Sequence, residues 1–121
     1  MNEAVERVVN DLKRFDNVMA IILFGSHAKN TAKPCSDIDI AVISDNPDME
    51  IEAEVSSASS RILDVVNFHR LPLYIQYEVF KHGKELFVRN EAFLTTVRFI
   101  TTRDYLELVS FYERMNARIL S

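Results

Sequence analysis

The sequence has no tryptophan, only two glycines and a single cysteine among its 121 residues. The lone cysteine, Cys35, excludes a disulfide within the chain and fits a protein of the reducing cytoplasm. Its neighbours do not form a nucleophile–base pattern, so we do not expect it to be catalytic. The longest apolar run, residues 18–24, is far too short to cross a bilayer.

Basic residues are also in the minority. The chain has 14 Lys and Arg against 18 Asp and Glu, for a formal net charge of −4. Binding to bulk DNA or RNA needs a basic surface, so the charge balance argues against that class of partner. A single nucleotide is not excluded, because a metal ion can neutralise its charge. With 48% hydrophobic and 26% charged residues, the chain is expected to form one soluble globular domain over residues 1–121.

The pattern of apolar residues predicts helices alternating with strands. We expect an α/β domain, α+β in the broader sense, with a small mixed sheet, helices against one face and the functional site on the other. No repeat or linker divides the chain. The predicted helices are 3–16, about 48–61, 72–82 and 90–120, and the predicted strands are 18–24, 37–43, 62–68 and a short extended piece at 85–88.

Two aspartates, Asp37 and Asp39, begin the strand predicted at 37–43. Side chains two positions apart on a strand point to the same side, so the carboxylates should lie together, about 7 Å apart at Cα. A cation would stabilise such a pair. Taken alone, Asp37 as the cap of a turn and Asp39 as the partner of a basic side chain explain the pair equally well.

The preceding strand ends at Gly25-Ser26, ten residues before the aspartate pair. Without a Cβ, Gly25 allows a ligand or a sharp turn close to the backbone. Ser26 is a candidate cap for a short helix, whose first N–H groups suit a phosphate. If the two strands are neighbours, this turn and the aspartates meet at one end of the sheet.

A third carboxylate, Asp64, lies within an apolar strand. A buried carboxylate is costly without a partner, and a metal shared with the aspartate pair would provide one. The alternative partner is a nearby base, Arg61 or Arg70. Three carboxylates on one sheet face favour hard divalent cations, Mg²⁺ foremost, and two such ions about 4 Å apart can clamp an in-line phosphoryl displacement. We favour the metal.

The spacing Gly25-Ser26, ten residues, Asp37-x-Asp39 resembles the nucleotidyltransferases of the DNA polymerase β superfamily, and the short chain is similar to the minimal nucleotidyltransferase (MNT) family. The resemblance implies a polymerase β-like fold that transfers AMP from ATP to a hydroxyl with two Mg²⁺ ions. It implies that Gly25 and Ser26 bind the triphosphate. It also implies that Asp37, Asp39 and Asp64 are the catalytic metal ligands, Asp64 helping to activate the acceptor.

The sequence departs from the family pattern at two places. Members often carry an arginine two places after the glycine and a glycine near position 30, where this chain has His27 and Asn30. Asparagine tolerates left-handed backbone geometry, so the turn is expected to survive. Lys29 is the predicted substitute for the missing phosphate contact, and Ser36 joins it as a candidate nucleotide-binding residue.

The resemblance also implies a partner. Similar minimal enzymes are cytoplasmic antitoxins that adenylylate a tyrosine of a HEPN-domain toxin, a ribonuclease, and a homo- or hetero-oligomer is consistent with that role. No membrane is implied. Two alternatives stay open. One is a nucleotidyltransferase for small molecules such as aminoglycosides, and the other is a non-catalytic antitoxin that neutralises its partner by contact.

Overall fold

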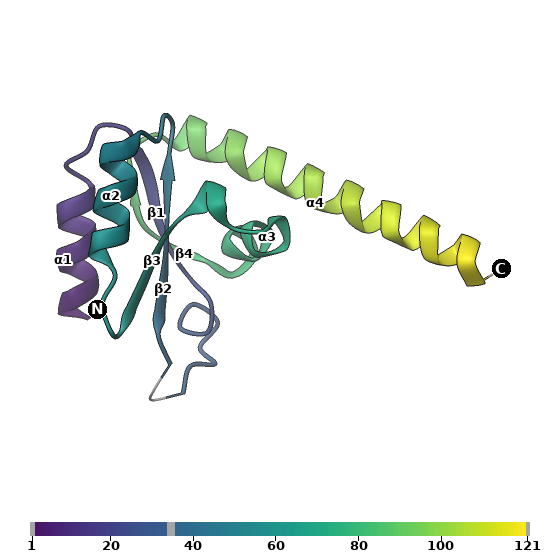
Figure 1. The fold of residues 1–121 in the computed structure, drawn as a ribbon, viewed down its shortest axis with the longest axis horizontal. Helices are drawn as coiled ribbons and strands as arrows, with labels where there is room; N and C mark the ends of the chain where they lie inside the picture. Colours follow the sequence, from purple (N-terminus) through teal and green to yellow (C-terminus); the bar gives the residue numbers. More distant parts are fainter. Residues whose placement is uncertain (1, 34–35, 121) are drawn as a thin grey trace.

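The computed structural model describes residues 2–33 and 36–120. Pro34 and Cys35, which belong to the loop predicted before the second strand, lie outside the described residues. Within the described part, no helix has the length and apolar character needed to span a membrane. The elements shown in Figure 1 are α1 (Glu3–Leu12), β1 (Val18–Phe24), β2 (Ile38–Ser44), α2 (Met49–Ala58), β3 (Leu63–Asn67), the 3₁₀ turn η1 (Phe68–Arg70), α3 (Leu73–His82), β4 (Lys84–Val88) and α4 (Glu91–Leu120).

The four strands form one mixed sheet in the order β3-β2-β1-β4. β1 runs antiparallel to both of its neighbours, β2 and β4, whereas β2 and β3 are parallel. The predicted mixed sheet is therefore confirmed. Because of these directions, the end of β1 and the beginnings of β2 and β3 lie at the same end of the sheet.

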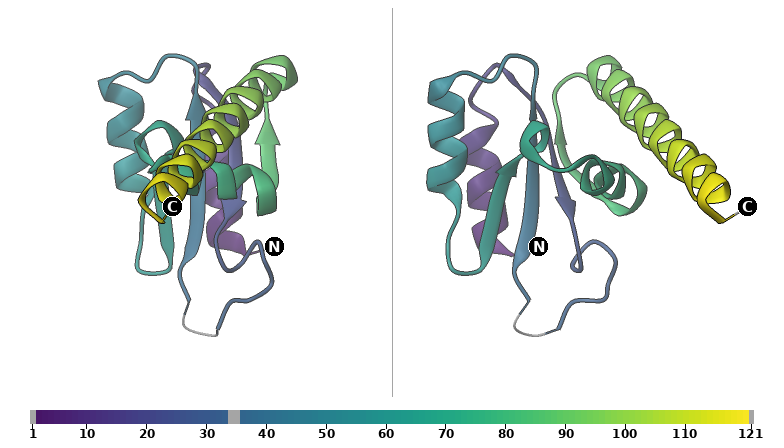
Figure 2. Two further views of the ribbon diagram at one scale, coloured as in Figure 1. Left: turned by 90° about the vertical axis from the view of Figure 1, so that its right-hand side faces the viewer. Right: turned by 45° about the vertical axis from the view of Figure 1, so that its right-hand side comes forward.

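Helices lie on both faces of the sheet. Figure 2 shows α1 and α2 on one side and α3 and α4 on the other. On the first face, Leu12 of α1, Ile51 of α2 and Ile40 of β2 belong to one buried apolar cluster. On the second, Val79 and Leu94 belong to a separate apolar cluster. The sequence predicted helices on one face only. The second face is covered in part because α3 and the start of α4 carry apolar sides of their own.

The turn between α1 and β1 is held by a distant arginine. α1 ends at Leu12 rather than at residue 16, and the chain then reverses into the sheet. The Arg89 guanidinium donates to the backbone oxygen of Val18 at 2.9 Å, to that of Phe15 at 3.2 Å, and to that of Lys13. Backbone carbonyl groups away from water need donors, and here the donor is the residue that directly follows β4.

β3 is an edge strand whose outer backbone groups are occupied by two serines. The Ser59 hydroxyl accepts from the N–H of Val65 at 2.9 Å and donates to its carbonyl at 3.2 Å. The Ser60 N–H donates to the Leu63 oxygen at 2.9 Å, and its hydroxyl accepts from the Leu63 N–H at 3.3 Å. The two serines thus take the place of a further strand along this edge.

α4 is much longer than the surface that it covers. It begins after Asn90, whose side-chain oxygen accepts from the Phe93 N–H at 3.0 Å. Leu94 is buried, and Tyr105 stacks on Tyr77 of α3 with ring centroids 4.1 Å apart. The rest of the helix projects from the domain (Figure 1). The large apolar side chains exposed along α4 are Phe99, Ile100, Leu106, Leu108, Phe111, Tyr112, Met115 and Ile119.

Candidate active site

The sheet register places Asp39 between Asp64 and the residue that precedes the Gly25 turn. On β2, Asp39 has Phe24 of β1, the residue before Gly25, as its partner on one side and Asp64 of β3 on the other. Neighbouring strands lie about 4.8 Å apart, so the backbones of Asp39 and Asp64 are in direct lateral contact. Asp37 directly precedes β2 and so lies at the same end of the sheet. The predicted meeting of the turn and the acids at one end of the sheet is confirmed.

Gly25 contacts the Asp39 side chain directly. Its φ is +73°, in the left-handed region that favours glycine. A Cβ built on Gly25 would lie 2.3 Å from Oδ2 of Asp39. No other residue fits this position without moving the carboxylate, so the turn and the carboxylate are built as one unit.

Residues 25–31 form tight turns in place of the short helix predicted to begin at Ser26. The amides of Ala28 and Lys29 donate to the Gly25 oxygen at 3.1 and 3.2 Å, and the Thr31 amide donates to the Ser26 oxygen at 2.9 Å. Asn30 has a φ of +58°, which confirms the left-handed geometry expected there. Among the described residues, the amides of Ser26 and His27 have no acceptor. They are the donors of this turn that an anion can use.

The electrostatics of the site are those of an uncompensated acidic cluster. Burial raises the pKa of Asp39 above its usual value, the negative charges of Asp64 and Asp37 raise it further, and the nearby His27 acts in the opposite direction. Within the described part of the chain, none of the three carboxylates has a hydrogen bond or an ion pair. The cluster therefore favours a cation.

The carboxylates are neighbours but not a finished chelate. Among residues 2–33 and 36–120, no three His, Cys, Asp or Glu side chains converge closely enough to hold a metal ion as they stand. Asp37 and Asp64 are exposed, so their carboxylates are free to turn toward Asp39. Mg²⁺ needs only one or two protein carboxylates when substrate phosphates and water complete its shell. The donor set fits that ion.

The expectation that Asp64 is a buried carboxylate is wrong. Its neighbours Leu63 and Val65 are buried, but Asp64 itself is exposed. Alternation along β3 turns its side chain to the second face, where α3 leaves the beginning of this edge strand uncovered. In the described residues, neither Arg61 nor Arg70 forms an ion pair with Asp64. The site carries the acid at its rim rather than in the core.

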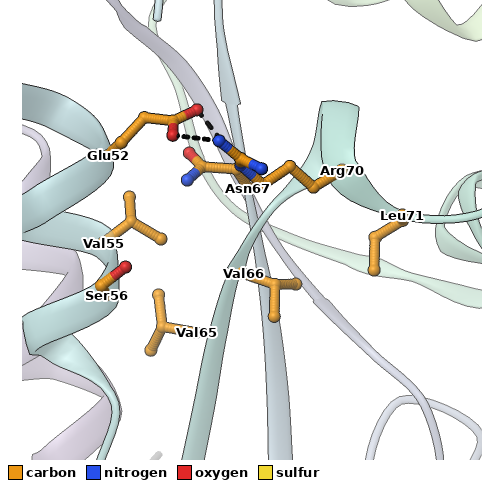
Figure 3. Close-up of a pocket in the computed structure, with 8 residues that line it drawn as sticks. All are labelled: Glu52, Val55, Ser56, Val65, Val66, Asn67, Arg70 and Leu71. Carbon is orange, nitrogen blue, oxygen red and sulfur yellow. Dashed lines mark hydrogen bonds and ion pairs between the residues drawn. The ribbon is translucent and has the colours of Figure 1, made fainter. Parts of the chain in front are cut away.

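Arg70 belongs instead to a second polar cluster, at the other end of β3. Its guanidinium donates to both carboxylate oxygens of Glu52, and Nε2 of His69 lies 2.9 Å from Oε1 of the same residue. Figure 3 shows the hollow of about 400 Å³ that this ion pair borders, between α2, β3 and η1. The side-chain oxygen of Asn67 is buried there without a hydrogen-bond partner in the described residues. This hollow is separate from the aspartates.

The two weaker nucleotide-binding candidates have partners of their own. Nζ of Lys29 lies 3.2 Å from Oε2 of Glu78 on α3, with both side chains partly exposed. The Ser36 hydroxyl accepts from the Lys33 N–H at 3.0 Å and so closes its own loop. Sequence reasoning missed Glu78, because nothing local in α3 distinguishes it from any exposed helix residue.

The chain belongs to the polymerase β nucleotidyltransferase family, whose model, "Polymerase beta, Nucleotidyltransferase", matches residues 6–92. The chain is also similar to a candidate protein adenylyltransferase of Methanocaldococcus jannaschii, with 37% identity over 70 residues. That match covers 58% of this chain and 56% of the relative, so the chain matches little more than half of that protein.

Solved structures share the fold over the full chain, α4 included. A toxin–antitoxin structure with AMP-PNP has a TM-score of 0.72 at 23% identity, and the match covers 100% of both chains. A structure of the tri-AMPylated Shewanella oneidensis HEPN toxin in complex with its MNT antitoxin has a TM-score of 0.66 at 19% identity, covering 97% of this chain and 93% of the other. At these identities the likeness establishes the fold, and the predicted fold class is confirmed.

Proposed function

We propose that this protein transfers AMP from ATP to a tyrosine hydroxyl of a HEPN-domain toxin and so acts as the antitoxin of the pair. The observation that carries the proposal is the pairing of Asp39 with Asp64 directly beside the Gly25 turn. Family membership supports nucleotidyl transfer. The adenylyltransferase relative supports AMP as the group transferred, and the similar toxin–antitoxin structures support the partner.

The three aspartates have distinct places in the reaction. Asp37 and Asp39 would hold Mg²⁺ between them, and Asp64 would complete a site for two ions. When bound, the ions supply charge stabilisation at the phosphates and lower the pKa of the attacking hydroxyl. Asp64 lies at the exposed rim, where an acceptor can reach it, and its carboxylate would receive the tyrosine proton. The tyrosine oxygen then bonds to the α-phosphorus as the bond to the leaving pyrophosphate breaks.

The turn after β1 would hold the triphosphate. The free amides of Ser26 and His27 offer two donors, and Gly25 keeps the backbone open beside Asp39. Lys29 is held nearby by Glu78 in a partly exposed ion pair of modest strength. If Lys29 exchanged the Glu78 carboxylate for a phosphate oxygen, the positive charge of Lys29 would lie at the nucleotide.

The projecting part of α4 supports a protein acceptor. Its exposed apolar side chains, among them Leu108, Tyr112 and Met115, follow one another at intervals of four and three residues. That spacing lines one side of a helix and suits packing against another helix. A single domain gains nothing from such a surface. The same surface also serves an antitoxin that acts by contact alone, so the test must separate the two.

The direct test uses ATP labelled at the α-phosphate, Mg²⁺ and a HEPN-domain toxin from the same organism as the acceptor. We expect label on a tyrosine of the partner, and its loss in Asp39→Asn and Asp64→Asn by roughly a hundredfold or more. Asp45→Asn, on the exposed turn after β2, is the matched control and should label normally.

Each alternative has its own outcome. Label that persists in Asp39→Asn would contradict the proposed site. Label found only on small metabolites of a cell extract would indicate a small-molecule enzyme. Undiminished neutralisation of the toxin by an Asp37→Ala, Asp39→Ala double variant would indicate an antitoxin that acts by contact. Binding of ATP with Mg²⁺ has a separate readout in the stability of the protein. At a hundred times the dissociation constant of the ATP–Mg²⁺ complex, the free energy of unfolding of the wild type should rise by about 2.7 kcal/mol.

A further inference from the structure

His27 joins the turn after β1 to the segment that leads into β2. Its Nε2 atom lies 3.0 Å from the backbone oxygen of Ser36, the residue just before Asp37. A carbonyl oxygen can only accept, so Nε2 carries the hydrogen and donates it. One hydrogen bond therefore connects the candidate phosphate turn to the candidate metal-binding pair.

The segment before Asp37 has little else to hold it. The Ser36 amide donates to the Lys33 oxygen at 3.0 Å, and the Ser36 hydroxyl accepts from the Lys33 amide at the same distance. These bonds close a turn within the loop but do not attach it to the sheet. In the described portion of the loop, the imidazole of His27 supplies that attachment.

The imidazole is partly enclosed by the chain around it. His27 is half-buried and lines a small hollow of about 170 Å³ together with Leu23 of β1 and Ile38 of β2. The ring thus lies beside the two strands that it links, and a half-buried ring has fewer rotamers available than a fully exposed one. Its hydrogen bond is therefore made with little further loss of entropy.

We propose that His27 is a positioning residue for nucleotidyl transfer. Its imidazole holds Asp37 at a fixed distance from the turn that would bind the triphosphate and from Asp39, which the sheet already fixes. The side chain acts through the Ser36 backbone, whereas only the backbone amide of His27 would face the nucleotide. This inference rests on the proposed function. Its structural part, the attachment of the loop, can be tested without any nucleotide.

The first experiment measures hydrogen exchange at residues 36–39 without nucleotide. His27→Ala removes the donor, whereas His27→Gln keeps an N–H at a similar reach without the ring. Exchange should be on the order of five- to tenfold faster in His27→Ala and close to wild type in His27→Gln. Thr31→Ala, which removes the 3.4 Å hydroxyl contact to Ser26 within the same turn, is the control and should leave exchange at 36–39 unchanged.

The second experiment measures AMP transfer. In His27→Ala, kcat should fall roughly tenfold while KM for ATP changes less, because misplaced metal ligands affect the reacting geometry more than binding. His27→Gln should recover most of kcat. If the alanine variant does not fold, His27→Asn replaces it, since its shorter amide does not reach Ser36. The inference is overturned if hydrogen exchange at residues 36–39 in His27→Ala equals that of the wild type. It is also overturned if His27→Gln performs no better than His27→Ala in both hydrogen exchange and AMP transfer. A wild type that transfers no AMP refutes the proposed function instead, and the exchange result still decides whether His27 attaches the loop.

Discussion

Gly25 and Asp39 face each other across the β1–β2 pair so closely that the carboxylate occupies the place of a Gly25 side chain. A Cβ at that position would lie 2.3 Å from Oδ2 of Asp39. The turn that would bind phosphate and the carboxylate that would bind metal therefore cannot change independently.

Gly25→Ala should damage both stability and the site. The residue combines a φ of +73° with the clash at Asp39, and we expect a loss of about 1–3 kcal/mol in the free energy of unfolding, measured by urea denaturation. Stabilisation by ATP with Mg²⁺ should disappear as well. Gly83→Ala is the matched control, because its Cβ would meet Val79 and Ile22 rather than an aspartate. It should destabilise the fold yet keep the response to ATP with Mg²⁺. Retention of that response in Gly25→Ala would argue against the site.

Asp39→Asn should stabilise the protein at neutral pH. Burial and the neighbouring carboxylates raise the pKa of Asp39, so the folded protein binds this proton at a higher pH than the unfolded chain. The ionised Asp39 therefore lowers stability above its raised pKa, and this penalty vanishes as the pH falls below the ordinary value of 3.8. In thermal melts without Mg²⁺, the variant should exceed the wild type at pH 7, and the difference should shrink on acidification. The exposed Asp45→Asn should show no such trend, and a pH-independent difference for Asp39→Asn would contradict the account.

Arg89→Ala should weaken the join between α1 and the sheet. The guanidinium serves three backbone oxygens of the reversing turn, and its loss should lower the free energy of unfolding by about 1–3 kcal/mol. Arg89→Lys should be nearly as unstable, because an ammonium group lacks the planar fork that reaches all three. Arg7→Ala on the exposed side of α1 is the control. Wild-type stability in the lysine variant would show that charge alone suffices.

A triple variant in which serine replaces Leu108, Tyr112 and Met115 should lose its association with the HEPN partner. These side chains are exposed in the isolated chain, so its melting temperature should change little, whereas copurification with the partner should fail. A double variant at two exposed acidic residues of α4, Glu107→Ser with Glu113→Ser, provides the control and should still copurify. Normal copurification of the triple variant would place the partner elsewhere.

The sequence was most informative where local chemistry decides the structure. The strand at 18–24 has the predicted bounds, because a continuous apolar run ends at a glycine that the turn requires. The left-handed Asn30 follows from its side chain in the same way. Asp39 and Asp64 could be placed together because the spacing of the motif resembles that of the nucleotidyltransferases, although the burial expected for Asp64 is wrong.

What the sequence could not give depends on contacts between distant residues. The turn after the early end of α1 is held by Arg89, which follows β4 and is 71 residues away from Val18 in the sequence. The exposure of Asp64 follows from the position of β3 at the edge, and that is a property of strand order rather than of the strand itself. The contact of Lys29 with Glu78 likewise exists only because α3 packs beside the turn.

The serines along β3 have a consequence for how this molecule meets others. Because Ser59 and Ser60 already satisfy the outward backbone groups of Leu63 and Val65, an extended segment from another chain finds no free amides or carbonyls at those positions. The addition of further strands along this edge of the sheet, which is how fibrous aggregation usually begins, is therefore disfavoured. Recognition at this margin is left to side-chain chemistry, which discriminates between partners far better than backbone pairing does.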